Sequence, residues 1–137
     1  MSVETIARPL PALYEWNRPF FAGGREGRLL LQRCRACRQL IYYPRIVCPY
    51  CLWNEYDWVP LSGRGTVYSF SVVWRPKHPA FDAEVPIVLA AIDLEEGVQI
   101  VSSLRGVNHD DAAIDMAVRV VFEQLSDDVF LPRFEAR

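Results

Sequence analysis

Several features that membrane, secreted and catalytic proteins depend on are scarce or missing in this chain of 137 residues. No apolar run approaches the ~20 residues of a membrane-spanning helix, so the sequence excludes a helical span. The first residues lack the long apolar core of a secretory signal peptide and include Glu4 and Arg8. We therefore expect a cytoplasmic protein whose thiols stay reduced.

Catalytic residues are also few. The chain has two histidines and no Gly-x-Ser-x-Gly motif, and its four cysteines all belong to one pattern described below. His78 stands between two prolines, which favours a rigid contact loop over a general base. His109 is most simply a solvated loop residue. The sequence thus predicts a binding or scaffolding module without catalytic machinery of its own.

Lysine is almost absent, because fourteen of the fifteen basic residues are arginine. Residues 1–60 hold eight arginines and five carboxylates, whereas residues 61–137 hold seven basic and twelve acidic residues. A nucleic-acid binder normally has a far more basic field, so this partner is disfavoured. The asymmetry suits a basic face that meets an anionic ligand or an acidic partner, although codon bias would also explain the arginines.

What the chain does have is two Cys-x-x-Cys pairs. Cys34 and Cys37 are followed, after ten residues, by Cys48 and Cys51, and no cysteine is left over. Four thiolates close the tetrahedral shell of Zn²⁺ and leave no open position, which predicts a structural site. The alternatives are an iron site of the rubredoxin type, four cysteines without a metal, and two disulfides, which the reducing compartment disfavours.

A short helix is expected before the first cysteine pair. Asn17 can cap it, Pro19 fits its first turn and Gly27 can end it. The large aromatic residues around it precede any sizeable core. They predict either a surface that a partner covers or rings that fold back on the metal-binding ribbon.

The remaining chain reads as strands. Residues 29–33, 40–43 and 58–61 predict a small ribbon, in which metal binding supplies much of the folding free energy. Five strands follow, at 65–75, 85–94, 98–104, 117–124 and 129–134. The second is nearly continuously apolar, which predicts burial on both faces. Five strands fit a closed barrel of the oligonucleotide/oligosaccharide-binding (OB) type, and a sandwich is the alternative.

The predicted fold is therefore mainly β, in three parts: an N-terminal helical segment at 1–28, a rubredoxin-like zinc ribbon at 29–60 and an OB-fold domain at 61–137. Several stretches of this chain resemble one known family: PFFAGGREGRLLLQRC, the CRAC and CPYC pairs, LSGRGTVYSFSVVWRPKHPAF, VPIVLAAIDLEEG, and VRVVFEQL with FLPRF. The chain resembles the zinc-ribbon plus OB-fold proteins that accompany acyl-CoA thiolases and thiolase-like aldolases, over about residues 16–136.

The resemblance implies that Cys34, Cys37, Cys48 and Cys51 bind structural zinc. It also implies a non-catalytic subunit whose thiolase-fold partner supplies the catalytic Cys and His. The family acts on CoA esters, by thiolysis, condensation or retro-aldol cleavage. Arg38 and Leu52 stand where many members have Gly after a pair's second cysteine, at a position that needs φ > 0. No fused hydratase domain is visible, which predicts a stand-alone subunit.

Two site hypotheses follow from the resemblance. A partner-docking face is expected at Trp16, Phe20, Phe21, Arg25 and Arg28, continued by Arg33 and Arg35 of the ribbon. An access loop for acyl-CoA is expected at Arg75, Lys77, His78 and Phe81, since Arg clusters bind the phosphates of CoA. The expected assembly is a heterotetramer of two thiolase-fold and two accessory chains. The alternatives are a nucleic-acid-binding module and an independent acyl-CoA hydrolase or carrier.

Overall fold

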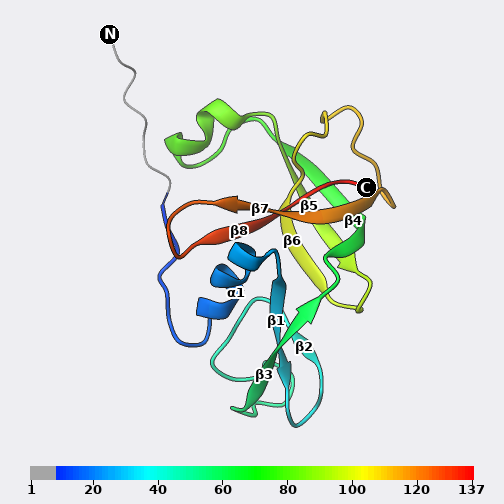
Figure 1. Cartoon of the computed structure of the whole chain (residues 1–137). Helices are drawn as coiled ribbons and strands as arrows, with labels where there is room; N and C mark the ends of the chain where they lie inside the picture. Colours follow the sequence, from blue (N-terminus) through cyan, green and yellow to red (C-terminus); the bar gives the residue numbers. More distant parts are fainter. Residues whose placement is uncertain (1–8) are drawn as a thin grey trace.

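The structure is a computed structural model and describes residues 9–137 (Figure 1). Its elements, in chain order, are α1 (Arg18–Ala22), the 3₁₀ helix η1 (Gly23–Glu26), β1 (Leu29–Cys34), β2 (Leu40–Ile41), β3 (Tyr56–Leu61), β4 (Arg64–Val73), the 3₁₀ helix η2 (Pro79–Glu84), β5 (Ile87–Leu94), β6 (Gln99–Ser103), β7 (Ala117–Gln124) and β8 (Phe130–Ala136). The predicted order of short helix, ribbon and five-stranded barrel is confirmed. Within residues 9–137, no helix is long and apolar enough to cross a membrane.

The N-terminal helix is shorter than a regular two-turn helix and continues as η1. Asn17 occupies the N-cap, but its side chain does not cap α1. Its Oδ1 instead accepts from the N–H of Tyr14, and its Nδ2 donates to the carbonyl of Ala12, which fixes the segment leading into the helix. Gly27 ends η1 in the left-handed conformation at φ 70°, as the sequence predicted.

The ribbon is a three-stranded antiparallel sheet in the order β2-β1-β3. Strand β1 is its centre, and Leu29 and Leu31 of this strand are buried in the main core. Gln32, also buried, holds two loops together through its amide. Its Nε2 donates to the carbonyls of Trp16 and Arg45, and its Oε1 accepts from the N–H of Arg45, at 2.8–3.1 Å.

The barrel is an antiparallel sheet in the order β6-β5-β4-β7-β8. A parallel bridge between Leu104 and Phe134 brings its two edges together, so the barrel is nearly closed. Gly97, at φ 90°, makes the predicted hairpin turn between β5 and β6. The expectation that residues 85–94 are buried on both faces is wrong. Burial in β5 alternates, because one face lines the barrel and the other carries the exposed Leu89.

One core joins all three parts of the chain. It contains Phe20 and Phe21 of α1, Leu29 and Leu31 of β1, and barrel residues such as Phe134. Figure 1 shows α1 and η1 lying between the ribbon and strands β7 and β8. The helix therefore acts as the connection between ribbon and barrel.

Candidate metal centre and ligand pocket

The two Cys-x-x-Cys pairs form two knuckles with the same backbone design. In each, the N–H of the first cysteine donates to the carbonyl five residues later, and the N–H four residues later donates to the first cysteine's carbonyl, at 2.8–3.0 Å. Arg38 and Leu52 close the two turns at φ 66° and 67°. The left-handed conformation predicted for these non-glycine residues is thus present in both knuckles.

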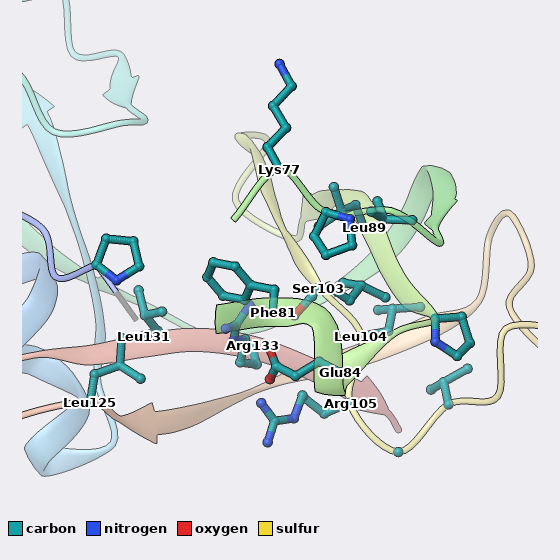
Figure 2. A pocket seen from close by; sticks show the side chains of 17 residues that line it. Lys77, Phe81, Glu84, Leu89, Ser103, Leu104, Arg105, Leu125, Leu131 and Arg133 are labelled. Carbon is teal, nitrogen blue, oxygen red and sulfur yellow. Dashed lines mark hydrogen bonds between the residues drawn. The ribbon is translucent and has the colours of Figure 1, made fainter. Parts of the chain in front are cut away.

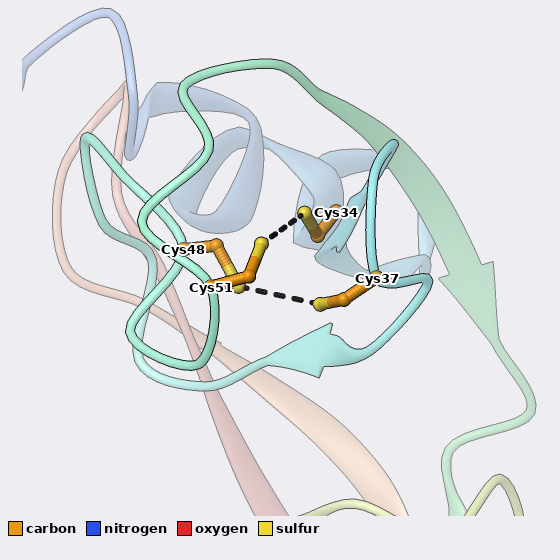
Figure 3. Close-up of side chains that lie close together, drawn as sticks. All are labelled: Cys34, Cys37, Cys48 and Cys51. Atoms are coloured by element: carbon orange, nitrogen blue, oxygen red, sulfur yellow. Dashed lines mark hydrogen bonds between the residues drawn. The ribbon is translucent and has the colours of Figure 1, made fainter.

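The four sulfur atoms meet at one point (Figure 3). The Sγ atoms of Cys34 and Cys51 are 3.5 Å apart, those of Cys37 and Cys48 are 3.6 Å apart, and all four lie within 4.8 Å of one another. A tetrahedral zinc site with Zn–S about 2.3 Å has sulfurs about 3.8 Å apart. The donor set and its spacing fit a closed, structural Zn²⁺ site, as the sequence predicted.

The two thiols of the first pair have pKa values shifted in opposite directions. The backbone N–H of Cys37 lowers the pKa of the Cys34 thiol to about 6, against the opposing effect of burial. The N–H of Gln39 likewise lowers the pKa of the Cys37 thiol, but burial and the neighbouring sulfurs outweigh it and raise that pKa to about 12. Sulfurs this close do not all ionise without a cation, and Zn²⁺ supplies one.

A pocket of about 690 Å³ lies between η2 and the ends of strands β4, β5, β6 and β8 (Figure 2). Most of its lining is apolar. Its charged lining residues are Lys77, Arg105 and Arg133 against one carboxylate, Glu84. The pocket therefore suits a ligand that is partly apolar and negatively charged.

A polar cluster beside η2 positions the most buried of these cations. Arg133 donates from Nη1 to the Ser103 hydroxyl at 2.7 Å and from Nε to Glu123 at 3.3 Å. Arg105 also pairs with Glu123. Two guanidinium groups thus share one carboxylate, and the Arg133 side chain is only 16% exposed. Sequence analysis missed this cluster, because its residues come from β6, β7, β8 and the loop after β6.

The four residues of the predicted access loop have different positions. Lys77 and Phe81 line the pocket, and Figure 2 shows Lys77 extending away from the other lining side chains. Arg75 and His78 are not among the residues that line it. His78 is instead the N-cap of η2, where its Nδ1 accepts from the N–H of Ala80 at 3.1 Å. This hydrogen bond fixes the start of η2, and the contact role predicted for His78 stays a prediction.

The predicted docking face needs a correction. Phe20 and Phe21 are only 3% and 2% exposed, and Phe20 packs on the rings of Phe21 and Tyr43. The expectation that these two rings form a surface for a partner is therefore wrong, since the chain's own core uses them. Trp16 is half-buried and stacks on Tyr14 at 5.1 Å.

Arg25 and Arg28 of the predicted docking face are exposed, but each already interacts with other residues of this chain. Arg25 donates to the carbonyl of Asp127 and lies over the Phe130 ring, and Arg28 pairs with Glu26 at 3.8 Å. On the barrel, His109 is not simply solvated as expected. Its ring meets the exposed Trp74 edge to face at 5.1 Å.

Comparison with known proteins agrees with this architecture. Residues 21–56 match the family described as "ChsH2, rubredoxin-like zinc ribbon domain", and residues 58–123 match "ChsH2, C-terminal OB-fold domain". In a solved structure entitled "Ltp2-ChsH2(DUF35) aldolase", one chain superposes with a TM-score of 0.79 at 36% identity, covering 93% of this chain and 98% of that one. This chain belongs to the ChsH2/DUF35 family.

Two sequence relatives extend the picture. A "Probable enoyl-CoA hydratase alpha subunit" of Thermomonospora curvata is 38% identical over 127 residues, which cover 93% of this chain but 39% of that protein. A "Benzoylsuccinyl-CoA thiolase subunit BbsA" of Thauera aromatica is 36% identical over 85 residues, covering 62% of this chain and 57% of the relative. This ChsH2/DUF35 chain thus spans less than two thirds of the length of each of these two relatives.

Proposed function

We propose that this ChsH2/DUF35 chain is a non-catalytic accessory subunit of a thiolase- or aldolase-type enzyme that acts on acyl-CoA. The observation that carries the proposal is the near full-length likeness to the ChsH2(DUF35) chain of an aldolase. The relatives named as subunits of a hydratase and a thiolase act, by their names, on CoA thioesters. The shared ribbon and barrel are then the part that serves these different reactions.

The chemistry of the described residues supports a scaffolding role. The cysteines form a closed metal shell, which offers no position for substrate. Within residues 9–137, neither histidine is hydrogen-bonded to a hydroxyl or a thiol: His78 accepts from a backbone N–H, and His109 contacts Asp110 and Trp74. Nucleophilic catalysis needs such a pair, so the partner supplies it.

The pocket beside η2 is the proposed place of acyl-CoA contact. Its apolar lining suits an acyl or pantetheine chain. Its three cations face Glu84 and the Glu123 that pairs with both arginines, which leaves an excess of one positive charge for the phosphates of CoA. Phe81 lies against the apolar part and Lys77 at the rim. The proposal narrows the predicted access loop to these two residues, with His78 holding the loop and Arg75 outside it.

The assembly is proposed as two catalytic and two accessory chains. Trp16, Arg25 and Arg28 stay candidates for the contact between them, because their side chains are at least partly exposed. Phe20 and Phe21 contribute to this contact only indirectly, because they anchor the helix in the core.

The pocket is tested in the reconstituted complex. Phe81→Ala with Lys77→Ala is expected to raise the KM for acyl-CoA by about tenfold or more, because the pair removes an apolar contact and a cation. Arg75→Ala is the matched control, since it removes an exposed cation two residues away that does not line the pocket. An unchanged KM in the double variant, with intact assembly, contradicts the proposed acyl-CoA contact.

A further inference from the structure

The second knuckle has an exposed apolar surface that the metal site does not require. Ile46, Val47, Tyr50, Leu52 and Trp53 are all exposed, and Leu52 is the most exposed at 75%. These five residues, here named the knuckle surface, lie within eight consecutive positions. Exposed apolar side chains gathered in this way mark an interaction site more often than scattered ones do.

The first knuckle provides an internal comparison. It has the same backbone hydrogen bonds and the same positive φ, so the residues of the two turns correspond one to one. Where the first turn has Ala36, Arg38 and Gln39, the second has Tyr50, Leu52 and Trp53. The turn and the metal therefore tolerate polar residues at two of these positions. The apolar residues of the second knuckle serve another purpose than holding zinc.

The charged residues of the ribbon indicate what kind of partner surface could cover the knuckle surface. The ribbon's two carboxylates, Glu55 and Asp57, both pair with Arg35, at 3.8 Å and 2.8 Å. Arg33 and Arg45 have no ion pair with any residue in the described part of the chain, whereas Arg38 interacts electrostatically with Asp57. Arg45 directly precedes Ile46. The surface is thus apolar with the exposed Arg45 at its edge, which is complementary to an apolar depression edged by carboxylates.

We infer that the knuckle surface docks on the catalytic subunit, in an apolar depression edged by Asp or Glu. The inference rests on the proposed function, because the catalytic subunit it names is the one proposed above. It moves the principal contact from the helix, whose phenylalanines are buried, to the second knuckle. Trp53 and Tyr50 belong to the residue types that dominate interface energetics.

The helix still contributes, but by positioning. Buried Gln32 binds the carbonyls of both Trp16 and Arg45, so it holds the loop between β2 and the second knuckle against the segment before α1. The loop that carries Ile46 and Val47 is thereby fixed to the core at one end and to the metal at Cys48. A surface held at both ends loses little conformational entropy on binding.

The test uses the full zinc-loaded chain and the catalytic subunit that copurifies with it from native cells, identified by mass spectrometry. The dissociation constant is measured by titration calorimetry for the wild type and for a double variant, Leu52→Arg with Trp53→Gln. This variant gives the second knuckle the residue types found at the equivalent positions of the first, Arg38 and Gln39. We expect at least about thirtyfold weaker binding with unchanged zinc content. Trp53→Ala and Gln39→Ala form a matched pair at equivalent positions, and only the first is expected to weaken binding.

The outcomes separate the two proposals. If the wild type and the double variant bind the catalytic subunit with equal affinity, the knuckle surface is not the docking site, and the proposed accessory-subunit function is unaffected. A wild-type chain that binds no thiolase- or aldolase-type protein overturns the proposed function and, with it, the occupant named here. A chain that sediments as a dimer dissociated by Leu52→Arg, or that binds a single-stranded oligonucleotide through these residues, also overturns the inference.

Discussion

Arg38 and Leu52 show how single residues set the shape of the metal site. Each has positive φ, a conformation that costs a non-glycine residue about 1–2 kcal/mol. The knuckle hydrogen bonds impose it nonetheless, since the carbonyl of the first cysteine must receive the N–H of this residue. The sequence alone indicated the strain, because the residue type and its distance from the cysteine pair define the position.

Glycine and alanine at position 38 are therefore expected to differ in their effect on stability. Arg38→Gly is expected to raise the free energy of unfolding of the zinc-loaded chain by up to about 1 kcal/mol, because glycine adopts positive φ freely. Arg38→Ala removes the same side chain but keeps the strain, so it serves as the control. Urea denaturation of both variants measures the difference. An Arg38→Gly chain that is less stable than Arg38→Ala contradicts the strain.

Replacing a cysteine ligand is expected to change the stability more than replacing Arg38. Cys48→Ser is expected to lose bound zinc and to unfold the ribbon, because structural zinc contributes on the order of 10 kcal/mol in small modules. Zinc content by atomic emission and the thermal melt measure this. Wild-type chain stripped by a chelator is the control and should give the same melt. Full zinc occupancy in Cys48→Ser shows that the four cysteines do not form the site described.

Among the elements, β1 connects the largest number of separate parts of the structure. It is the central strand of the ribbon, places leucines in the main core and carries Gln32 between two loops. Gln32 is fully buried and makes three hydrogen bonds, so its loss leaves backbone groups of Trp16 and Arg45 without these partners. Unpaired groups of this kind cost about 1–3 kcal/mol each.

Gln32→Leu is thus expected to lower the free energy of unfolding by about 3 kcal/mol, although leucine is apolar and of similar size. Arg33→Leu, one residue along the same strand, is the control, because its side chain makes a single exposed hydrogen bond to Arg38. Chemical denaturation compares the two. A Gln32→Leu variant as stable as Arg33→Leu shows that the amide does not hold the loops.

The type and order of the secondary-structure elements were easier to predict than their burial and their packing partners. Strand type, order and the turn at Gly97 follow from local patterns, and the structure has them. The burial of β5 was misjudged, because an apolar run does not reveal that the barrel leaves the Leu89 face outside. Phe20 and Phe21 were misplaced for a similar reason. Their partners Tyr42 and Tyr43 lie more than twenty residues away, and only the folded chain brings them together.

At the scale of the whole molecule, the metal centre was fully predictable and the pocket was not. Four ligands in two short pairs carry their spacing in the sequence. The pocket combines η2 with residues from β4, β5, β6, β8 and neighbouring loops, so its half-buried Arg133 and buried Ser103 had no local signal. Only Lys77 and Phe81 were anticipated, through a loop that the resemblance singled out. The boundaries proposed at residues 28 and 60 stay predictions.

The central claim is that this chain works as a subunit of a larger acyl-CoA enzyme. Purification of the tagged chain from its native cells, followed by mass spectrometry and light scattering, tests it most directly. The account predicts a near-stoichiometric thiolase- or aldolase-type protein, in a complex whose mass fits two copies of each chain. A chain that is recovered alone, or with nucleic acid, contradicts the account and leaves a binding module as its better description.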